Sequence, residues 1–346
     1  MREIEVGVLG ATGIVGQQFV ARLAHHPWFR PTWLAASERS EGKPYASVAP
    51  WRLAVPIPDD AAKRTVEACT PGRGPRVVFS ALDASAAGEI EQAFAAAGHF
   101  VVSNARNYRM DPLVPLLIPE VNADHLRLLA EQQKSNSWKG AIVTNPNCST
   151  VVLAMALAPL RPFKITKVLV STMQAVSGAG YPGVPSLDIL GNVVPFIGGE
   201  EEKIESETLK ILGSDGGRTP HPAVISAQTN RVAVIDGHLM TISLDLAARP
   251  PMDDVVAALR EFSGRPQELD LPSAPKPPIV VATENNRPQP RLDADRGDGM
   301  AVTVGRVRPC TVTHAKLVAL GHNTVRGAAG AAILNAELMA ADGVFD

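Results

Sequence analysis

Two hydrophobic patterns divide this sequence into an earlier and a later part. In the earlier part, short continuous apolar runs alternate with stretches in which apolar residues recur at the period of a helix with one buried face. Continuous apolar strands that alternate with helices indicate a parallel sheet covered on both faces. We expect strands at residues 4–9, 32–36, 76–81, 99–103 and 140–144, and helices at 85–97 and 124–133.

The later part has a different pattern, in which apolar and polar residues alternate. Alternation is typical of strands with only one buried face, and therefore of an antiparallel or mixed sheet. Alternating strands are expected at 240–246 and 300–304, β-rich runs at 165–176 and 229–234, and helices at 200–212, 252–262 and 323–341. The later part is therefore predicted to be an α+β domain with a mixed, largely antiparallel sheet.

A glycine-rich turn joins the first strand to a helical pattern. Residues 4–9 lead into Gly10-Ala11-Thr12-Gly13-Ile14-Val15-Gly16, and apolar residues then follow at helical spacing. A strand, a glycine turn and a helix together let backbone amides approach a pyrophosphate at the helix N-terminus. The spacing is GxxGxxG instead of the usual GxGxxG, so a turn that only packs the helix against the strand is the alternative.

The segment after the second expected strand bears on the choice of dinucleotide. Ser37-Glu38-Arg39-Ser40 lies about where a Rossmann-type sheet contacts the adenosine ribose. Arg39 and the two serines offer a cation and hydroxyl donors for a 2′-phosphate, which favours NADP, while Glu38 leaves use of NAD open. A solvated polar loop is the alternative without a ligand. Ser80-Ala81-Leu82 and Asn104 follow other strands and should emerge on the same rim of the sheet.

Cys148 is the candidate nucleophile. It follows the strand at 140–144 and the turn Asn145-Pro146-Asn147, and it precedes an apolar helical pattern. The sulfur should therefore lie at a helix N-terminus, where unpaired backbone N–H groups favour the thiolate and could stabilise an oxyanion. The alternative is that Cys148 is a small buried hydrophobic residue, as most free cysteines are.

Polar residues in the later part could serve this thiol. Arg231 and His238 flank an Asp-Gly turn, which would put them on neighbouring strands or at a strand end. His238 is a candidate general acid/base because imidazole titrates near neutral pH, although a surface histidine with satisfied hydrogen bonds is the alternative. Gln174 ends a β-rich run ahead of a glycine-rich loop, a good place for a positioning amide. Glu200 to Lys203 most simply opens a solvated, acid-capped helix.

Composition excludes several classes of function. The chain of 346 residues has 33 basic and 35 acidic side chains, so it lacks the basic surplus that nucleic-acid binding demands. We find no apolar run of membrane-spanning length and no signal-peptide pattern, so we expect a cytoplasmic protein. Its three cysteines are far apart and its histidines lack metal-ligand spacing, so neither disulfides nor a metal site is expected.

Together these patterns predict an α/β fold with two domains, because the chain exceeds what one core usually covers. The first is a Rossmann-type doubly wound parallel sheet, and the second is an α+β substrate domain whose large sheet, with only one buried face, could also serve as a dimerisation interface. The expected ranges are 1–148 for the NADP-binding domain, 149–322 for the catalytic and dimerisation domain, and 323–346 for a C-terminal helix that returns to the first domain.

Seven stretches in the same order give the sequence a family resemblance. It resembles the aspartate-β-semialdehyde dehydrogenase family, in particular its archaeal and fungal branch, over nearly the whole chain. The matching stretches are GATGIVGQ at 10–17, SERSEGK at 37–43, YRMDPLVPLLIPEVN at 108–122, NPNCST at 145–150, QAVSGAG at 174–180, GGEEEKIESETLKIL at 198–212 and QTNRVAVIDGH at 228–238.

The resemblance implies roles for individual residues. Cys148 would be the nucleophile, His238 the acid/base and Gln174 the residue that orients the acyl intermediate. Arg231 would bind the substrate carboxylate, Glu200 its amino group, and Arg109 and Lys203 the phosphate, with Asn147 also at the substrate. NADP would be bound by Gly10, Thr12, Gly13, Ile14, Val15, Ser37, Arg39, Ser40, Ser80, Ala81, Leu82, Ser177, Gly178 and, as a looser match, Asn323.

The implied reaction is the NADPH-dependent reductive dephosphorylation of aspartyl phosphate to aspartate semialdehyde, in lysine, methionine and threonine biosynthesis. A Cys148 thioester would form with loss of phosphate, and His238 would protonate the intermediate after hydride transfer. The resemblance also implies a homodimer or homotetramer. The alternatives are a related reductase acting on N-acetylglutamyl phosphate or malonyl-CoA, and a non-catalytic NADP-binding sensor.

Overall fold

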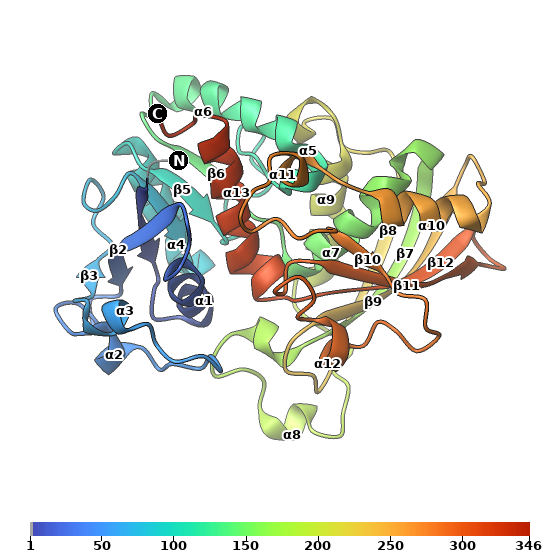
Figure 1. Cartoon of the computed structure of the whole chain (residues 1–346), viewed down its shortest axis with the longest axis horizontal. Coiled ribbons are helices and arrows are strands. Elements are labelled where there is room, and N and C mark those ends of the chain that lie inside the picture. The colour runs from blue at the N-terminus through green and yellow to red at the C-terminus, as the bar shows by residue number, and fades with distance from the viewer. Residues whose placement is uncertain (1–2) are drawn as a thin grey trace. The chain divides into compact units, whose positions relative to one another are not determined.

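The computed structural model describes residues 3–346, which cluster into two compact units (Figure 1). The first unit runs to Leu117 and also includes Asp124–Asn145 and Ala328–Asp346. The second unit comprises Ile118–Ala123 and Pro146–Gly327.

The first unit is built on a parallel six-stranded sheet with the order β3-β2-β1-β4-β5-β6. This is the strand order of the doubly wound dinucleotide-binding fold, so the Rossmann-type prediction is confirmed. Its strands are β1 (Ile4–Leu9), β2 (Phe29–Ala36), β3 (Glu67–Ala68), β4 (Val77–Ser80), β5 (Phe100–Ser103) and β6 (Ala141–Thr144). Its helices are α1 (Ile14–Leu23), α2 (Tyr45–Val48), α3 (Asp59–Lys63), α4 (Ala84–Ala96), α6 (Leu128–Asn136) and α13 (Gly330–Ala341).

Helices cover both faces of this sheet. Phe79 of β4 stacks on Phe19 of α1, with 4.9 Å between the ring centroids. The preceding residue, Val78, belongs instead to a buried cluster with Phe94 of α4. Because successive strand residues point to opposite faces, α1 and α4 must lie on opposite sides of the sheet. This explains why the strands are apolar throughout and could be recognised as short continuous runs.

The second unit is built on a mixed six-stranded sheet with the order β10-β11-β12-β9-β7-β8. The pairs β11/β12, β12/β9 and β9/β7 are antiparallel, and β10/β11 and β7/β8 are parallel, which confirms the mixed, largely antiparallel prediction. Its strands are β7 (Ile165–Gln174), β8 (Val224–Arg231), β9 (His238–Leu246), β10 (Ile279–Val281), β11 (Val302–Pro309) and β12 (Ala315–Gly321). Its helices are α5 (Pro119–Asn122), α7 (Cys148–Leu157), α8 (Ser186–Ile189), α9 (Glu200–Leu212), α10 (Met252–Glu261), α11 (Arg265–Glu268) and α12 (Pro290–Asp293).

Helix α7 lies in the core of the second unit. It contacts α9 on one side and strands β9, β11 and β12 on another, and every residue from Ser149 to Leu157 is buried. A helix that is apolar all round is stable only when it is enclosed. The first turn of this helix, which carries Cys148, is therefore fixed by the surrounding core.

Several predicted boundaries were wrong. Strand β2 begins at Phe29 instead of residue 32, with Pro31 beside an irregularity in its pairing with β1. Strand β8 covers Val224–Arg231 instead of 229–234. The expected helix at 124–133 is a 3-10 turn (Ala123–Arg127) followed by α6, and the expected helix at 323–341 is a π-helical turn (Val325–Ala329) followed by α13. Strands β3, β10 and β12 were not predicted.

Candidate functional site

Three polar side chains lie at the same end of adjacent strands in the second unit. Gln174 and Arg231 end the parallel strands β7 and β8 and face each other in register. His238 begins β9, which runs antiparallel to β7 with Met173 opposite Leu239. Because β7 separates β8 from β9, Arg231 and His238 are not on neighbouring strands, and the strand-end alternative is the correct one.

The backbone of Ala175 links Arg231 to His238. The Arg231 guanidinium donates to the Ala175 carbonyl at 2.7 Å, and the Ala175 N–H donates to His238 Nδ1 at 3.1 Å. Gly178 lies against the same pair, since a Cβ there would be 2.9 Å from Arg231 Nη1 and 3.1 Å from His238 Cε1. Only glycine lets this loop approach the two side chains so closely.

His238 is held as a neutral ring. It is fully buried, and burial together with the charges of Arg231 and His322 lowers the pKa of His238 to about 3. Because Nδ1 accepts a hydrogen bond, the proton of the neutral ring must lie on Nε2. Among residues 3–346, Nε2 of His238 is one of the buried polar atoms without a hydrogen-bond partner. The ring therefore has one N–H available for a ligand.

Cys148 is the first residue of α7, as the sequence predicted. The preceding residue, Asn147, caps the helix with its side-chain oxygen, which accepts from the N–H groups of Ser149 at 2.8 Å and Thr150 at 3.2 Å. Burial lowers the pKa of Arg231, and the negative charges of Cys148 and Glu200 oppose that shift. The thiolate and the guanidinium are therefore close enough to stabilise each other.

Gly327 packs directly against Cys148. A Cβ at this position would lie 2.6 Å from the Cβ and 3.0 Å from the Cα of Cys148. The adjacent Arg326 is fully buried and donates from both terminal nitrogens to Glu120 at 2.8 Å. This ion pair fixes the π-helical turn that carries Gly327 next to Cys148, and neither Arg326 nor Gly327 was among the predicted site residues.

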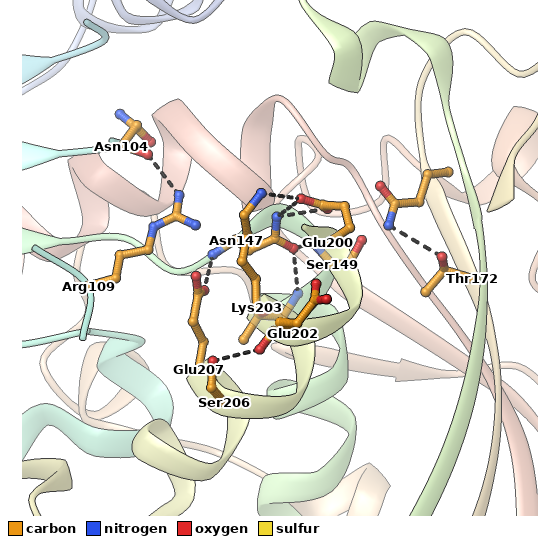
Figure 2. A network of polar contacts seen from close by, with 12 residues as sticks. Asn104, Arg109, Asn147, Ser149, Thr172, Glu200, Glu202, Lys203, Ser206 and Glu207 are labelled. Atoms are coloured by element: carbon orange, nitrogen blue, oxygen red, sulfur yellow. Dashed lines mark hydrogen bonds and ion pairs between the residues drawn. The ribbon is translucent and has the colours of Figure 1, made fainter. Parts of the chain in front are cut away.

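Helix α9 presents charged side chains to Asn147 (Figure 2). Both carboxylate oxygens of Glu200 accept from Asn147 Nδ2 at 2.9 Å, and Lys203 donates to Glu200 at 3.0 Å. Glu207 accepts from the backbone N–H of Asn147 at 2.6 Å. The helix at 200–212 is thus not simply a solvated, acid-capped helix, because Glu200 and Glu207 are buried.

Asn323 is placed next to the loop that follows β7. Its side chain accepts from the N–H of Gly237 at 2.8 Å and donates to the hydroxyl of Ser177 at 2.7 Å. Both of its polar groups therefore hold the chain around His238 and Gly178 in position.

The first unit gathers most of the residues predicted to bind the dinucleotide. Gly10 has a φ of +72°, and a Cβ there would lie 2.6 Å from the Ala81 carbonyl oxygen. Gly13 is the N-cap residue of α1 and has no side chain that could bond to the amides of the first turn. This turn includes Ile14 and Val15 and has no acidic residue. A helix N-terminus with free amides and no competing carboxylate can accept a phosphate group.

Beyond β2, Ser37, Glu38 and Arg39 are exposed, whereas Ser40 is buried. Exposed hydroxyl and guanidinium groups at this strand end are compatible with a ribose phosphate. The hydroxyl of Ser80 has a different role, since it donates to Glu91 at 2.6 Å, as does that of Ser103. The Ser80 side chain is therefore buried in a contact with α4.

Arg109 also lies in the first unit, where its guanidinium donates to the Asn104 carbonyl at 2.8 Å. Burial raises the pKa of Glu91, and the charge of Arg109 opposes that shift. Glu91 was missed in the sequence, although it lies at helical spacing with the apolar residues Ala87 and Phe94. The sequence signal for a role of Glu91 was its place on an apolar helix face, because a carboxylate is buried only when it has polar partners.

Residues 3–346 contain no cluster of three or more histidine, cysteine or acidic residues that could hold a metal ion. None of the helices formed by these residues combines the length and apolarity needed to cross a bilayer.

Comparison with known proteins identifies the family of both units. Residues 5–129 match the family model described as semialdehyde dehydrogenase, NAD binding domain, and residues 157–326 match the one described as semialdehyde dehydrogenase, dimerisation domain. The chain is 52% identical over 343 residues to an aspartate-semialdehyde dehydrogenase of Methanothermobacter thermautotrophicus, which covers 97% of this chain and 99% of that protein.

Two other relatives bear on structure and substrate. A crystal structure of aspartate semialdehyde dehydrogenase with NADP from Candida albicans matches with a TM-score of 0.89 and 42% identity, over 99% of each chain. A malonyl CoA reductase (NADP) of Metallosphaera sedula is 40% identical over 354 residues, covering 100% of this chain and 99% of that protein.

Proposed function

The chain belongs to the aspartate-semialdehyde dehydrogenase family, and from this premise we propose how its residues carry out the reaction. The protein is an NADP-dependent oxidoreductase that converts L-aspartyl-4-phosphate to L-aspartate-4-semialdehyde. This reaction serves the biosynthesis of lysine, methionine and threonine. The assignments of individual residues below are our proposal.

We propose that the first unit binds NADP through the glycine turn and the end of β2. The residues present fit this cofactor, because Gly10 and Gly16 lack side chains that would collide with the neighbouring backbone and α1 begins with free amides. Gly10, Thr12, Gly13, Ile14 and Val15 would hold the pyrophosphate, and Ser37, Arg39 and Ser40 the 2′-phosphate. Bound NADPH supplies the hydride that reduces the acyl group. Ser80, Ala81, Leu82, Ser177 and Gly178 would contact the rest of the cofactor, and Asn323 would act by positioning Ser177.

We propose that Cys148 attacks the acyl phosphate as a preformed thiolate. The observation that carries this assignment is the place of Cys148 as the first residue of α7, directly after the Asn147 cap, with Arg231 near enough to interact with it. A cation and a helix N-terminus both favour the thiolate, so no separate base is required to generate it. A C–S bond then forms as the C–O bond to phosphate breaks, and Arg109 and Lys203 would stabilise the departing phosphate.

His238 would act through the proton on Nε2. Its Nδ1 is occupied by the Ala175 N–H, so the neutral ring can donate a hydrogen bond from Nε2 but cannot readily take up a second proton. An N–H aimed at the acyl oxygen would stabilise the oxyanion that forms when the thioester is reduced. Collapse of that intermediate releases the aldehyde and regenerates the Cys148 thiolate. Gln174 would orient the acyl group, Arg231 would bind the α-carboxylate, and Glu200 the α-ammonium.

Substitution of the nucleophile tests this scheme. Cys148→Ser should bind NADP with unchanged affinity in calorimetry and should lose nearly all activity, because an alkoxide is far less available than a thiolate at neutral pH. Cys310→Ser, which removes a cysteine of the β11/β12 connection, serves as the matched control and should remain active. Appreciable turnover by Cys148→Ser would exclude the covalent scheme.

We also propose that the protein is cytoplasmic and works as a homodimer or homotetramer. The match of residues 157–326 to a dimerisation-domain model supports the oligomer. Malonyl-CoA reduction is the second candidate function, favoured by the 40% identity to the Metallosphaera enzyme.

A further inference from the structure

The helix that carries the nucleophile lacks half of the usual N-terminal cap. In a capping box, the side chain of the N-cap residue accepts from the N–H groups of the first turn, and a glutamate or glutamine of that turn accepts from the N-cap backbone N–H. Asn147 provides the first part of this arrangement. The residue at the reciprocal position is Thr150, whose buried hydroxyl is without a hydrogen-bond partner among the described residues. Helix α7 therefore cannot hold the Asn147 N–H by itself.

A carboxylate from another helix accepts the hydrogen bond from the Asn147 N–H instead. Glu207 of α9 accepts from the Asn147 N–H at 2.6 Å, and only 2% of Glu207 is exposed. Glu200, seven residues earlier on the same helix, holds the Asn147 side-chain amide. The Asn147 carbonyl accepts from Val151 at 3.0 Å. Every polar group of Asn147 thus has a partner, and two of these partners are carboxylates of α9 (Figure 2).

We propose that Glu207 is a positioning residue for the reaction, and that it sets the place of Cys148 by fixing the peptide group that precedes it. The inference rests on the proposed role of Cys148 as nucleophile. Hydrogen bonds to a charged acceptor are roughly twice as strong as neutral ones, and this bond is shielded from water. Since Asn147 is the residue immediately before Cys148, a movement of its N–H group changes the direction in which the thiol emerges from the helix. Asn147 then contributes to the site as part of this cap.

Two substitutions separate the acceptor from the charge. Glu207→Gln keeps an acceptor oxygen at the same reach and removes the charge, whereas Glu207→Asp keeps the charge and withdraws the oxygen by one methylene. If position is what matters, Glu207→Gln should retain most of the activity and Glu207→Asp should lose more. Misplacement of a reacting group by about 1 Å can cost on the order of 100-fold in rate, which sets the upper limit for the loss in Glu207→Asp. The loss should fall on kcat, with KM and the Kd for NADP unchanged.

Glu205 provides a matched control. It lies two residues before Glu207 on α9, and its carboxylate also accepts a hydrogen bond from a backbone N–H, that of Ala227 in strand β8, at 2.9 Å. Glu205 is only half-buried, so Glu205→Asp should lose no more stability than Glu207→Asp, and it should keep kcat. Thermal unfolding of all three variants would show that any difference in kcat is not a difference in folding.

Alkylation of Cys148 by iodoacetamide, followed by mass spectrometry of the Cys148 peptide, gives a second measurement that requires no substrate. Glu207→Asp should change the alkylation rate at constant pH, and Glu205→Asp should not. The proposal is overturned if Glu207→Asp keeps wild-type kcat and alkylation rate, if Glu207→Gln falls as far as Glu207→Asp, or if Glu205→Asp loses kcat equally. Failure of the proposed function would appear differently, as a wild-type protein without activity on aspartate semialdehyde.

Discussion

At the scale of single residues, the site consists of polar groups that satisfy one another and a few that are left over. Asn147, Asn323 and the backbone of Ala175 use their hydrogen-bonding groups to hold neighbouring elements in place. Within residues 3–346, His238 Nε2 is among the few buried side-chain atoms left without a partner. A buried donor without a hydrogen-bond partner costs free energy, so such a donor is expected where a bound ligand accepts its hydrogen bond. In the proposed reaction, the unpaired Nε2 of His238 would donate to the substrate oxygen.

The buried neutral state of His238 predicts how stability depends on pH. The pKa of His238 is about 3 in the folded protein, against an ordinary value of about 6.5 in the unfolded chain. Between these values the unfolded state binds a proton that the folded state does not, so stability falls as the pH decreases from about 6.5 toward 3. The slope for one proton is about 1.4 kcal/mol per pH unit.

His238→Asn tests this dependence, because its amide oxygen can still accept from the Ala175 N–H but does not titrate. Urea unfolding of both proteins at several pH values below neutrality should show a shallower decline for the variant. An identical decline in the two proteins would mean that His238 is not the buried neutral group.

At the scale of secondary structure elements, the strands and helices that were predicted correctly are those whose apolar pattern matches the faces that are buried in the structure. Strand β1 and helix α9 have the predicted bounds because the first is apolar throughout and the second is amphipathic with an acidic first turn. Strand β8 was misplaced because Val232 and Val234 continue an apolar alternation beyond Arg231, where the strand ends. Strand β12 was missed because Leu317 to Leu320 is nearly continuous apolar sequence in a domain where alternation was expected. It is central in the sheet and is therefore enclosed on both edges.

In the candidate site too, only residues with a recognisable local sequence pattern could be predicted. Cys148, Gln174, Arg231 and His238 could be predicted because each stands next to a turn or at the end of a strand. Glu207, Arg326 and Gly327 act through contacts with residues distant in sequence, such as the ion pair of Arg326 with Glu120. A single sequence carries no local signal for such contacts, since a glutamate inside an amphipathic helix most simply faces solvent.

The close approach of Gly327 to α7 gives a prediction for the element that carries the nucleophile. In Gly327→Ala the new Cβ would meet the Cβ of Cys148 at 2.6 Å, so the π-helical turn or the start of α7 must move. We expect a loss of about 1–3 kcal/mol in stability from overpacking and a fall in kcat. Thermal unfolding and steady-state kinetics measure both effects.

The control is Gly198→Ala, where the new Cβ would meet nothing closer than 3.9 Å. It should leave stability and kcat unchanged. Equal behaviour of the two variants would show that the contact between Gly327 and Cys148 does not constrain the nucleophile.

At the scale of the whole molecule, residues with proposed roles occur in both units. The first contains the glycine turn and Arg109, and the second contains Cys148, His238, Arg231 and α9. The second unit begins its long segment at Pro146 and ends it at Gly327, so the nucleophile and the glycine packed against it are near opposite ends of that segment. Relatives of this chain with the same length and related sequence carry different activities, so the substrate must be determined by individual side chains and not by the fold.

The choice of acyl substrate gives the prediction for the whole enzyme. Glu200 offers a buried carboxylate, held by Lys203 and Asn147, to a substrate ammonium group. Aspartate semialdehyde has this ammonium group, whereas malonate semialdehyde lacks it and N-acetylglutamate semialdehyde has it acylated. In a coupled assay with phosphate and NADP, only aspartate semialdehyde should be oxidised efficiently, because only its ammonium group can form an ion pair with Glu200 in addition to the contacts from Lys203 and Asn147. Glu200→Gln should reduce kcat/KM for aspartate semialdehyde and narrow its advantage over malonate semialdehyde.

Equal turnover of the three aldehydes by the wild-type protein would remove Glu200 as the determinant of specificity. A preference for malonate semialdehyde with coenzyme A would favour the second candidate function.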